Sequence, residues 1–455
     1  MIHAMTNTSM TQAPAAAAAD RAARRQAVIE AMRAAGGGVA ILPTAPERMR
    51  NRDSDYPYRW DSYFHYLAGF PEPEAVLVIV ADADRAESIL FCREKNEERE
   101  TWDGFRYGPQ AAAEQFGFDR ALPIGSLDEE VPRLLANRGA LFHALGADET
   151  LDARVRLWLG EVRAQARAGV CSPTRAIDLL AMLDEMRLRK DEAELDTMRR
   201  AARISAAAHR RAMIASAPGR FEYEIEAELL HEFRRQGSQA PAYGSIVAGG
   251  RNGCVLHYRG NDAVLRDGDL LLIDAGCELD SYASDITRTF PVSGRFSAAQ
   301  RDVYAVVLAA QAAARDATRP GAHWNQPHEA AVKVLAQGML DLGLLKGSLD
   351  AVLENGDYRR FYMHRTGHWL GMDVHDAGEY KLGGDWRPLV EGMVLTIEPG
   401  CYIRPAEDIP EAFWNIGIRI EDDAVVTADG CELITEGVPK AIDDIEALMR
   451  EARHD

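Results

Sequence analysis

The chain has 455 residues and carries 71 Asp and Glu against 52 Lys and Arg, a formal net charge of −19 at pH 7. Charge of this sign repels nucleic acid and anionic membrane surfaces, so neither is expected as a partner. The length allows two or three domains, and the 47% of hydrophobic residues suffices for ordinary globular cores.

The N-terminal residues 1–20 are rich in Ala, Thr and Asn, which is typical of a disordered tail. No Lys or Arg precedes Arg21 and the segment has no long apolar run, so it has the features of neither a signal peptide nor a transit peptide. The aliphatic run at 75–81 is far too short to cross a bilayer. Six scattered cysteines without a C-x-x-C pair predict reduced thiols, and we expect a soluble, cytoplasmic protein.

Residues 21–178 alternate between helical and strand signals, which predicts an α/β domain. The segment 21–38 has the pattern of a helix stopped by glycines, and 74–82 and 87–94 have the apolar runs of buried strands. Residues 179–216 then favour one long helical stretch with a polar break at 189–192, and the domain boundary is placed at its start.

The second domain, 179–445, mixes helices and strands without regular alternation, which predicts an α+β fold. One helix is expected to end at Gly237, and another to begin at Ser297, which forms a capping box with Gln300. A further helix is expected near Pro327. Two antiparallel strands joined around 429–430 are expected close to the C-terminus.

One phrase occurs twice in this domain, as "DGDLLLIDAGC" at 267–277 and "EGMVLTIEPGC" at 391–401. In both copies an apolar strand ends at an acid, Asp274 or Glu398, seven residues after the first acid. The repeat predicts two related halves around a curved sheet, each delivering one carboxylate. Cys277 and Cys401 could serve as thiolate ligands, but small buried hydrophobic residues are the better interpretation.

Two further acids lie on strand-like segments, and one histidine completes a ligand set. Asp285 shares a strand face with Thr287, Glu421 lies in "GIRIED", and His368 lies in "HRTGHWLGMDVHD". Four carboxylates gathered in an apolar site would repel one another and take up protons. Two divalent cations would neutralise them. The alternative is that each acid is an independent cap, turn or surface residue.

A carboxylate-rich set with one imidazole and no thiolate favours Mn²⁺ or Co²⁺, with Fe²⁺ and Zn²⁺ as alternatives. Two such ions about 3.5–4 Å apart hold a bridging hydroxide and polarise a carbonyl, which is chemistry for amide hydrolysis. A carboxylate near the attacking solvent must transfer a proton, and Glu398 is the candidate.

The segments "LLIDAGCELDSYASDITRTFPVSGRFS", "HWLGMDVHD", "TIEPGCYI" and "GIRIEDD", with "YFHYLAGFPEPEAVLVIV" in the first domain, carry a family resemblance. The chain resembles the pita-bread metallopeptidases and, within them, the Xaa-Pro aminopeptidases (aminopeptidase P). The resemblance covers roughly residues 25 to 440. It implies a creatinase-like N-terminal α/β domain, a pita-bread catalytic domain with an internal pseudo-twofold repeat, and release of the residue that precedes proline in a peptide substrate.

The resemblance also implies roles for individual residues. Asp274 is similar to a ligand of one metal ion, His368 and Glu398 to ligands of the other, and Asp285 and Glu421 to bridging ligands. The remaining positions are similar to residues that contact the substrate or its transition state: His257 and His375 as catalytic histidines, and His364, Tyr402, Arg419 and Trp102 in substrate binding.

Other members of the same fold remain alternatives. Prolidase uses the same ligands and cuts Xaa-Pro dipeptides, and a non-catalytic binding protein would be expected to have lost ligands. Methionine aminopeptidase would not need the first domain, and creatinase lacks these ligands. Trp102 lies in the first domain, which in this family can help to close a neighbouring subunit's site, so we expect a homo-oligomer, a dimer or a tetramer. Gly244 departs from the family, in which a polar residue is common.

Overall fold

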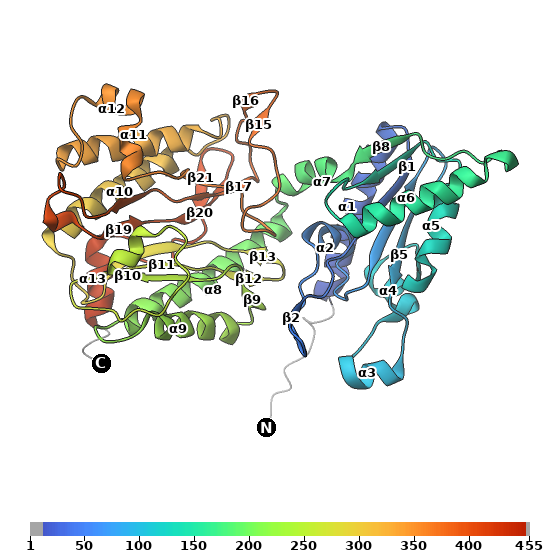
Figure 1. The fold of residues 1–455 in the computed structure, drawn as a ribbon, viewed down its shortest axis with the longest axis horizontal. Coiled ribbons are helices and arrows are strands. Elements are labelled where there is room, and N and C mark those ends of the chain that lie inside the picture. The colour runs from blue at the N-terminus through green and yellow to red at the C-terminus, as the bar shows by residue number, and fades with distance from the viewer. Residues whose placement is uncertain (1–11, 452–455) are drawn as a thin grey trace. The chain divides into compact units, whose positions relative to one another are not determined.

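The computed structural model describes residues 12–451, which form two compact units, one up to Asp184 and one from Glu185 onward (Figure 1). Both mix helices and strands, as the predicted fold class requires. Helix α1 begins at Gln12, inside the segment predicted as a disordered tail, and the part of that tail over residues 1–11 lies outside the described residues. The predicted boundary between 178 and 179 stays a prediction.

The N-terminal unit is built around a six-stranded mixed sheet in the order β6-β5-β4-β1-β7-β8. Its strands are β1 (Gly38–Pro43), β4 (Val76–Ala81), β5 (Ala86–Cys92), β6 (Arg120–Pro123), β7 (Ala140–His143) and β8 (Arg175–Asp178), with a small hairpin of β2 (Met49–Asn51) and β3 (Ser54–Asp55). Its helices are α1 (Gln12–Ala34), α2 (Ser62–Ala68), α3 (Glu97–Asp103), α4 (Gly108–Phe116), α5 (Leu127–Leu135) and α6 (Glu149–Ala164). The apolar runs at 74–82 and 87–94 thus form adjacent antiparallel strands, as predicted.

Alternation along the central strands explains how this sheet is buried. Val39, Ile41 and Val78 point to one face and pack with Val131 of α5 and Trp158 of α6. The intervening strand residues are buried as well, so the sheet is covered on both faces. Because both faces of the sheet are covered, its central strands have continuous apolar runs in place of an alternating pattern.

The C-terminal unit contains the predicted helices and the predicted break between them. Its helices are α7 (Leu179–Leu188, which begins before the unit boundary), α8 (Glu192–Ala215), α9 (Glu222–Arg235), α10 (Ala298–Ala317), α11 (Gln326–Asp341), α12 (Leu349–Asn355) and α13 (Ile442–Glu451). A capping box of Asp191 and Glu194 starts α8, and the predicted one of Ser297 and Gln300 starts α10. The side-chain caps satisfy backbone N–H groups that the first helical turn leaves unpaired.

Several short sheets complete this unit. They are ordered β10-β11-β14, β13-β12-β9, β17-β20-β21, β18-β19 and β15-β16. The strands are β9 (Ala240–Pro241), β10 (Ile246–Gly249), β11 (Leu270–Asp274), β12 (Cys277–Leu279), β13 (Tyr282–Ala283), β14 (Thr287–Pro291), β15 (Lys381–Leu382), β16 (Asp385–Trp386), β17 (Val394–Ile397), β18 (Gly400–Ile403), β19 (Ile416–Arg419), β20 (Asp422–Val426) and β21 (Cys431–Leu433). The expected C-terminal hairpin around 429–430 is β20 paired with β21.

The sequence repeat is also a structural repeat. Gly268 and Gly392, at equivalent positions before β11 and β17, share a backbone φ of +85°, a conformation that glycine adopts without strain. β11 pairs antiparallel with β14, and β17 pairs antiparallel with β20. The C-terminal unit therefore has the internal pseudo-twofold symmetry that the repeat predicted.

The cysteines of the repeat lie in the hydrophobic core of this unit. Cys277 is fully buried and Cys401 is 2% exposed, and both pack within the cluster that includes Leu271, Ile397 and Ile418. Burial raises the pKa of both thiols, which disfavours thiolate ligation. All six cysteines are free. Within residues 12–451, no helix combines the length and apolar character needed to span a bilayer.

Candidate metal centre

Strand pairing brings the four predicted acids together. Asp274 is the last residue of β11 and pairs in register with Thr287, the first residue of β14, and Asp285 lies two residues before Thr287. Glu398 directly follows β17, and Glu421 lies between β19 and β20. The two halves of the repeat thus each present one acid at the end of a buried strand and a second acid beside its partner strand.

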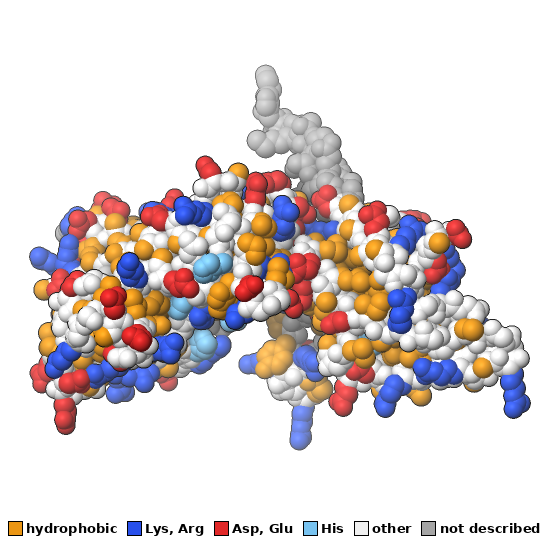
Figure 2. Space-filling view, turned by 90° about the horizontal axis from the view of Figure 1, so that it is seen from above, with side chains coloured by type: hydrophobic (Ala, Val, Ile, Leu, Met, Phe, Trp, Pro, Cys, Tyr) orange, Lys and Arg blue, Asp and Glu red, His pale blue; other side chains and the backbone are white. Residues whose placement is uncertain are grey.

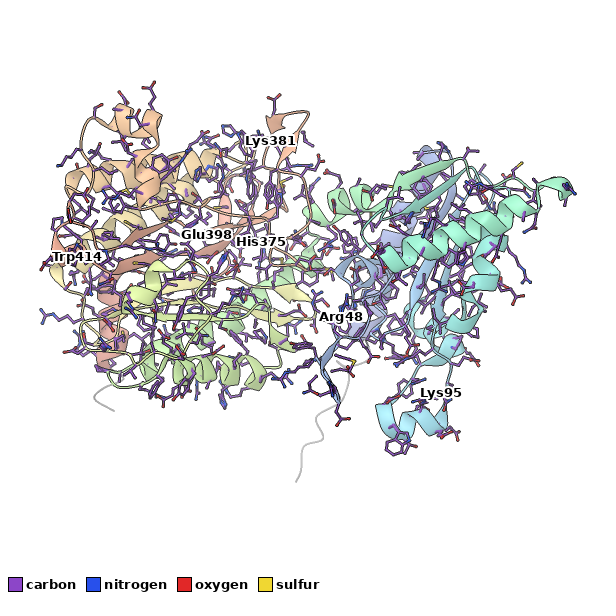
Figure 3. The ribbon with its side chains drawn as sticks, viewed as in Figure 1. Arg48, Lys95, His375, Lys381, Glu398 and Trp414 are labelled. Carbon is purple, nitrogen blue, oxygen red and sulfur yellow. The ribbon has the colours of Figure 1, made fainter. Side chains whose placement is uncertain are left out.

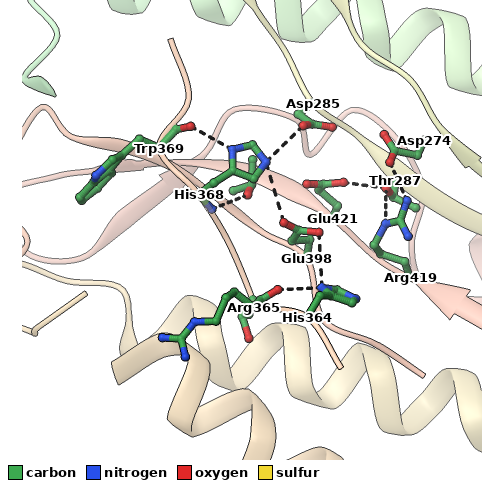
Figure 4. A network of polar contacts seen from close by, with 12 residues as sticks. Asp274, Asp285, Thr287, His364, Arg365, His368, Trp369, Glu398, Arg419 and Glu421 are labelled. Atoms are coloured by element: carbon green, nitrogen blue, oxygen red, sulfur yellow. Dashed lines mark hydrogen bonds and ion pairs between the residues drawn. The ribbon is translucent and has the colours of Figure 1, made fainter. Parts of the chain in front are cut away.

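His368 faces these acids from a segment outside the regular strands (Figure 4). Its Nε2 lies 3.5 Å from Asp285 Oδ2 and 3.8 Å from Glu398 Oε1. Its Nδ1 lies 2.9 Å from the carbonyl oxygen of Trp369, which can only accept, so Nδ1 carries the proton of the neutral ring. In this neutral form the Nε2 lone pair is directed at the acids, the arrangement of a metal-binding histidine. In the metal-free site Nε2 carries a proton, which a metal ion would displace.

The charge balance of the site fits divalent cations. Burial, the neighbouring acids and Arg419 act on the same carboxyl groups, and burial dominates: it raises the pKa of Glu398 to about 7 and the pKa of Glu421 well above its ordinary value. His368, with Asp285 and Glu398 beside it, has its pKa raised to about 9 despite burial. Ligand atoms of Asp285, His368 and Glu421 lie within 4.8 Å of one another. Such a group of oxygen atoms and one imidazole would hold hard divalent ions.

Asp274 and Asp285 share one neighbour that the sequence did not single out. The hydroxyl of Tyr243 lies 2.6 Å from Asp274 Oδ1 and also contacts Asp285 Oδ1. Burial and these acids raise the pKa of Tyr243 well above its ordinary value, so the phenol stays protonated and donates. Tyr243 therefore links the two acids of the first half-site. It lies outside the repeat and next to Gly244, and no pattern in the sequence marked it.

Arg419 and Thr287 hold the carboxylates of Asp274 and Glu421 in place. Thr287 donates from Oγ1 to Glu421 at 2.6 Å and accepts from Arg419 Nε at 3.1 Å. The Nη2 of Arg419 donates to Asp274 Oδ2, and its Nη1 lies 3.1 Å from the hydroxyl of Tyr402. The side chain of Arg419 thus contacts Asp274 directly and Glu421 through Thr287. The face that Thr287 shares with Asp285 in the sequence was the signal for this role.

These groups open into a cavity of about 640 Å³. Nine of its lining residues were predicted as site residues: Asp274, Asp285, His368, Glu398, Glu421, His257, His364, His375 and Arg419. In Figure 3, Glu398 and His375 lie near one another in this unit, and Figure 2 shows histidine side chains reaching its surface. The structure therefore gathers the predicted ligands and the three predicted substrate histidines in one place.

Two predicted residues do not line this cavity. Tyr402 is buried behind it, where its hydroxyl lies 2.8 Å from His364 Nε2. Trp102 lies in the N-terminal unit on α3, with 81% of its surface exposed. The cavity also contains aromatic residues that the sequence did not single out, Trp324, Tyr380 and Trp386. The last two come from the segment around the β15-β16 hairpin, which no sequence pattern predicted.

Two of the three substrate histidines, His364 and His375, have a lowered pKa and are held in neutral form by their surroundings. Burial, with Arg419 nearby, lowers the pKa of His364 to about 3. Burial and the neighbouring His368 lower the pKa of His375, whose ring centroid lies 4.2 Å from that of His368. A neutral imidazole at these positions donates one hydrogen bond from its protonated nitrogen and accepts one at the other nitrogen.

Comparison with known proteins places this site in a family. A model described as "Metallopeptidase family M24" matches residues 196–428, and one described as "Aminopeptidase P, N-terminal domain" matches residues 21–142. The chain is 45% identical to the Xaa-Pro aminopeptidase of Escherichia coli strain K12 over 432 residues, which cover 94% of this chain and 97% of the relative.

Solved structures agree with the family models. A Pseudomonas aeruginosa aminopeptidase superposes with a TM-score of 0.95 at 51% identity, covering 96% of this chain and 99% of that one. Escherichia coli aminopeptidase P in complex with substrate superposes with a TM-score of 0.94 at 44% identity, with the same coverage. The fold of both units and the order of their elements are therefore those of these enzymes.

Proposed function

The chain belongs to metallopeptidase family M24, and from that membership we propose that it is an Xaa-Pro aminopeptidase, an enzyme that releases the N-terminal residue from peptides with proline in the second position. One observation carries the proposal: five metal-ligand candidates converge on one cavity with three histidines beside them. Identity of 45% along almost the whole chain to an Xaa-Pro aminopeptidase, N-terminal domain included, favours this function over prolidase and over a non-catalytic binding protein.

The metal ligands would be Asp274, Asp285, His368, Glu398 and Glu421, and we propose Mn²⁺ as the ion. Oxygen ligands with a single imidazole and no thiolate support this assignment. Two divalent cations supply activation of a water molecule and polarisation of the scissile carbonyl. Asp285 and Glu421, whose ligand atoms lie together with that of His368, are the proposed bridging residues.

The protein groups orient the substrate and move the proton. The leaving nitrogen of proline must be protonated before the amide bond breaks, and the carboxylate of Glu398 takes a proton from the attacking water and delivers it there. His257 and His375, on the cavity wall, donate hydrogen bonds to oxygen atoms that gain negative charge. His364, fixed by Tyr402, is the proposed contact of the proline ring.

We also propose that the protein acts in the cytoplasm as a dimer or tetramer. The free cysteines favour a reducing compartment. Trp102, a large aromatic residue that is 81% exposed, is a surface that a second copy of the chain would cover. Sizing of the active protein tests this, and a fully active monomer would contradict it.

The decisive experiment is metal-dependent cleavage. The purified protein is stripped with a chelator, supplied with Mn²⁺, and given an Xaa-Pro-Yaa tripeptide and an Xaa-Pro dipeptide. We expect release of Xaa mainly from the tripeptide, and loss of that activity in Glu398→Gln. Cleavage of the dipeptide alone would establish a prolidase instead. Cleavage of neither with any of several divalent metals would favour the binding protein.

A further inference from the structure

The cavity of the metal centre has charges of opposite sign in different parts. Its lining includes four acids and also Arg259 and Arg365. Figure 4 shows the guanidinium group of Arg365 directed away from Glu398 and His364. Bound divalent cations would neutralise the acids, so Arg259 and Arg365 would leave positive charge on the cavity wall that attracts an anionic group of a ligand.

A second cation, Lys381, lies against the same aromatic ring as Arg365. The side chain of Trp386, which lines the cavity, has Arg365 Cζ 5.2 Å and Lys381 Nζ 4.4 Å from its ring centroid. Lys381 begins the β15-β16 hairpin, which Figure 3 shows apart from Glu398 and His375. Trp386 therefore holds two cations against one aromatic ring.

Neither cation is neutralised by an acid. Among residues 12–451, no carboxylate lies within ion-pair distance of Arg365, Lys381 or Arg259. Arg365 donates to the side-chain oxygen of Asn325, and the amide nitrogen of Asn325 in turn contacts Glu329. Arg365 lines the cavity and Lys381 lies against Trp386, which also lines it, so in a chain with a net charge of −19 these two cations offer a site for an anion from outside the chain.

We propose that Arg365 and Lys381 form a subsite for a carboxylate on the substrate residue that follows proline. This proposal rests on the proposed function. A short Xaa-Pro-Yaa peptide has an ammonium group at one end and a carboxylate at the other. The guanidinium of Arg365 matches the geometry of the carboxylate end. The favoured substrates are therefore short peptides with a free C-terminus, or peptides with an acidic third residue.

Gly244, which departs from the family pattern, leaves space for Arg259, a third cation that lines the cavity. A Cβ at Gly244 would lie 2.8 Å from Arg259 Nη1, so a side chain there would displace that guanidinium. The glycine thereby leaves Arg259 room at the cavity wall, where it adds to the attraction of an anionic substrate end.

The test compares KM for an Xaa-Pro-Yaa tripeptide and its C-terminal amide with the Mn²⁺-loaded protein. We expect the amide to raise KM about three- to tenfold at low salt with kcat little changed, because an exposed charge-assisted contact contributes binding alone. In each of the single variants Arg365→Gln and Lys381→Gln, KM for the tripeptide and KM for its amide should become nearly equal. Arg360→Gln is the control, since Arg360 pairs with Asp408 and does not line the cavity.

Two further substrates identify the source of the carboxylate. An Xaa-Pro-Asp amide that binds more tightly than the Xaa-Pro-Asn amide assigns the subsite to an acidic side chain, and equal binding of these two assigns it to the C-terminus. Equal KM for every acid and its neutral counterpart, with normal turnover, would overturn the subsite and leave the proposed function intact. Absence of cleavage of any Xaa-Pro peptide would overturn the function and the subsite together.

Discussion

Lys190 Nζ lies 2.8 Å from Asp376 Oδ2, and Asp376 directly follows the substrate histidine His375. Arg187, near the end of α7, donates to the other oxygen of Asp376 and also pairs with Asp373. The side chains of Arg187, Lys190 and Asp376 are each 1% exposed. The start of the C-terminal unit is thereby tied to the segment that carries His375 by a buried ionic network.

The first prediction concerns this network. Asp376→Asn leaves the buried Lys190 without its counter-charge and leaves Arg187 paired with Asp373 alone, which costs about 3–5 kcal/mol of unfolding free energy. Because His375 is the preceding residue, we also expect KM to rise while binding of Mn²⁺ stays unchanged. Urea unfolding and metal titration measure the two effects. Arg133→Gln, at an exposed pair with Glu129, is the matched control and should cost under about 1 kcal/mol.

An unchanged KM in Asp376→Asn would show that the network does not position His375. Lys190→Arg, which keeps the charge, should retain most of the activity, whereas Lys190→Met should not. If Lys190→Arg and Lys190→Met have equal activity, the packing of the side chain at position 190, and not its charge, holds the segment that carries His375.

The second prediction is the pH dependence of stability that the same network confers. Burial alone would raise the pKa of Asp376, but Lys190 and Arg187 outweigh it and lower that pKa. A lowered pKa in the folded state means that the contribution is fully present above the unfolded value of about 3.9 and is lost as pH falls through the folded value. The difference in unfolding free energy between the wild type and Asp376→Asn should therefore shrink as pH is lowered from 5 to 3. A constant difference over that range would contradict the prediction.

The third prediction concerns a close approach in the repeat. A Cβ at Gly276 would lie 1.6 Å from the carbonyl oxygen of Ser284 and 3.2 Å from the backbone nitrogen of Asp285. Gly276→Ala must shift this backbone, at a cost of about 3 kcal/mol, and must move Asp285. Thermal unfolding should show the destabilisation, and Mn²⁺ affinity should fall. Gly430→Ala, with open space around it, should change neither property. Unaltered metal affinity in Gly276→Ala would place Asp285 outside the ligand set.

The sequence predicted those parts of the site that lie on regular strands. Asp274 and Glu398 end repeated apolar runs, and strand periodicity placed Thr287 on the face of Asp285. Helices were predicted equally well where caps and breaks were encoded locally, as at 189–192 between α7 and α8.

What the sequence could not predict depends on contacts between distant segments. Tyr243 reaches Asp274 across 31 residues, and Lys190 reaches Asp376 across 186. The hairpin that carries Trp386 has two-residue strands, too short for any periodic signal. Helix α1 begins before the predicted end of the tail because its Ala-rich segment has high helix propensity, although its composition also resembles that of a disordered segment.

The last prediction concerns protons released when metal binds. In the metal-free protein, burial raises the pKa of Glu398 to about 7 and the pKa of Glu421 well above its ordinary value. Both carboxyl groups therefore carry protons at slightly acid pH, and divalent cations must displace them, because only the carboxylate form ligates. Binding of Mn²⁺ should release protons at pH 6 and release fewer as pH rises through 7. Titration calorimetry in two buffers of different ionisation enthalpy measures the number of protons released when Mn²⁺ binds.

A matched variant separates the contribution of one residue to this proton release. Glu398→Gln has no proton to lose at position 398, so its release at pH 6 should fall short of the wild type by roughly one proton, with the difference vanishing well above pH 7. Arg360→Gln, at a residue that pairs with Asp408 and does not line the cavity, should release as many protons as the wild type. Proton release that does not vary with pH would mean that Glu398 is already ionised in the metal-free site. The charges of Arg419 and His368 would then stabilise its carboxylate by more than burial destabilises it.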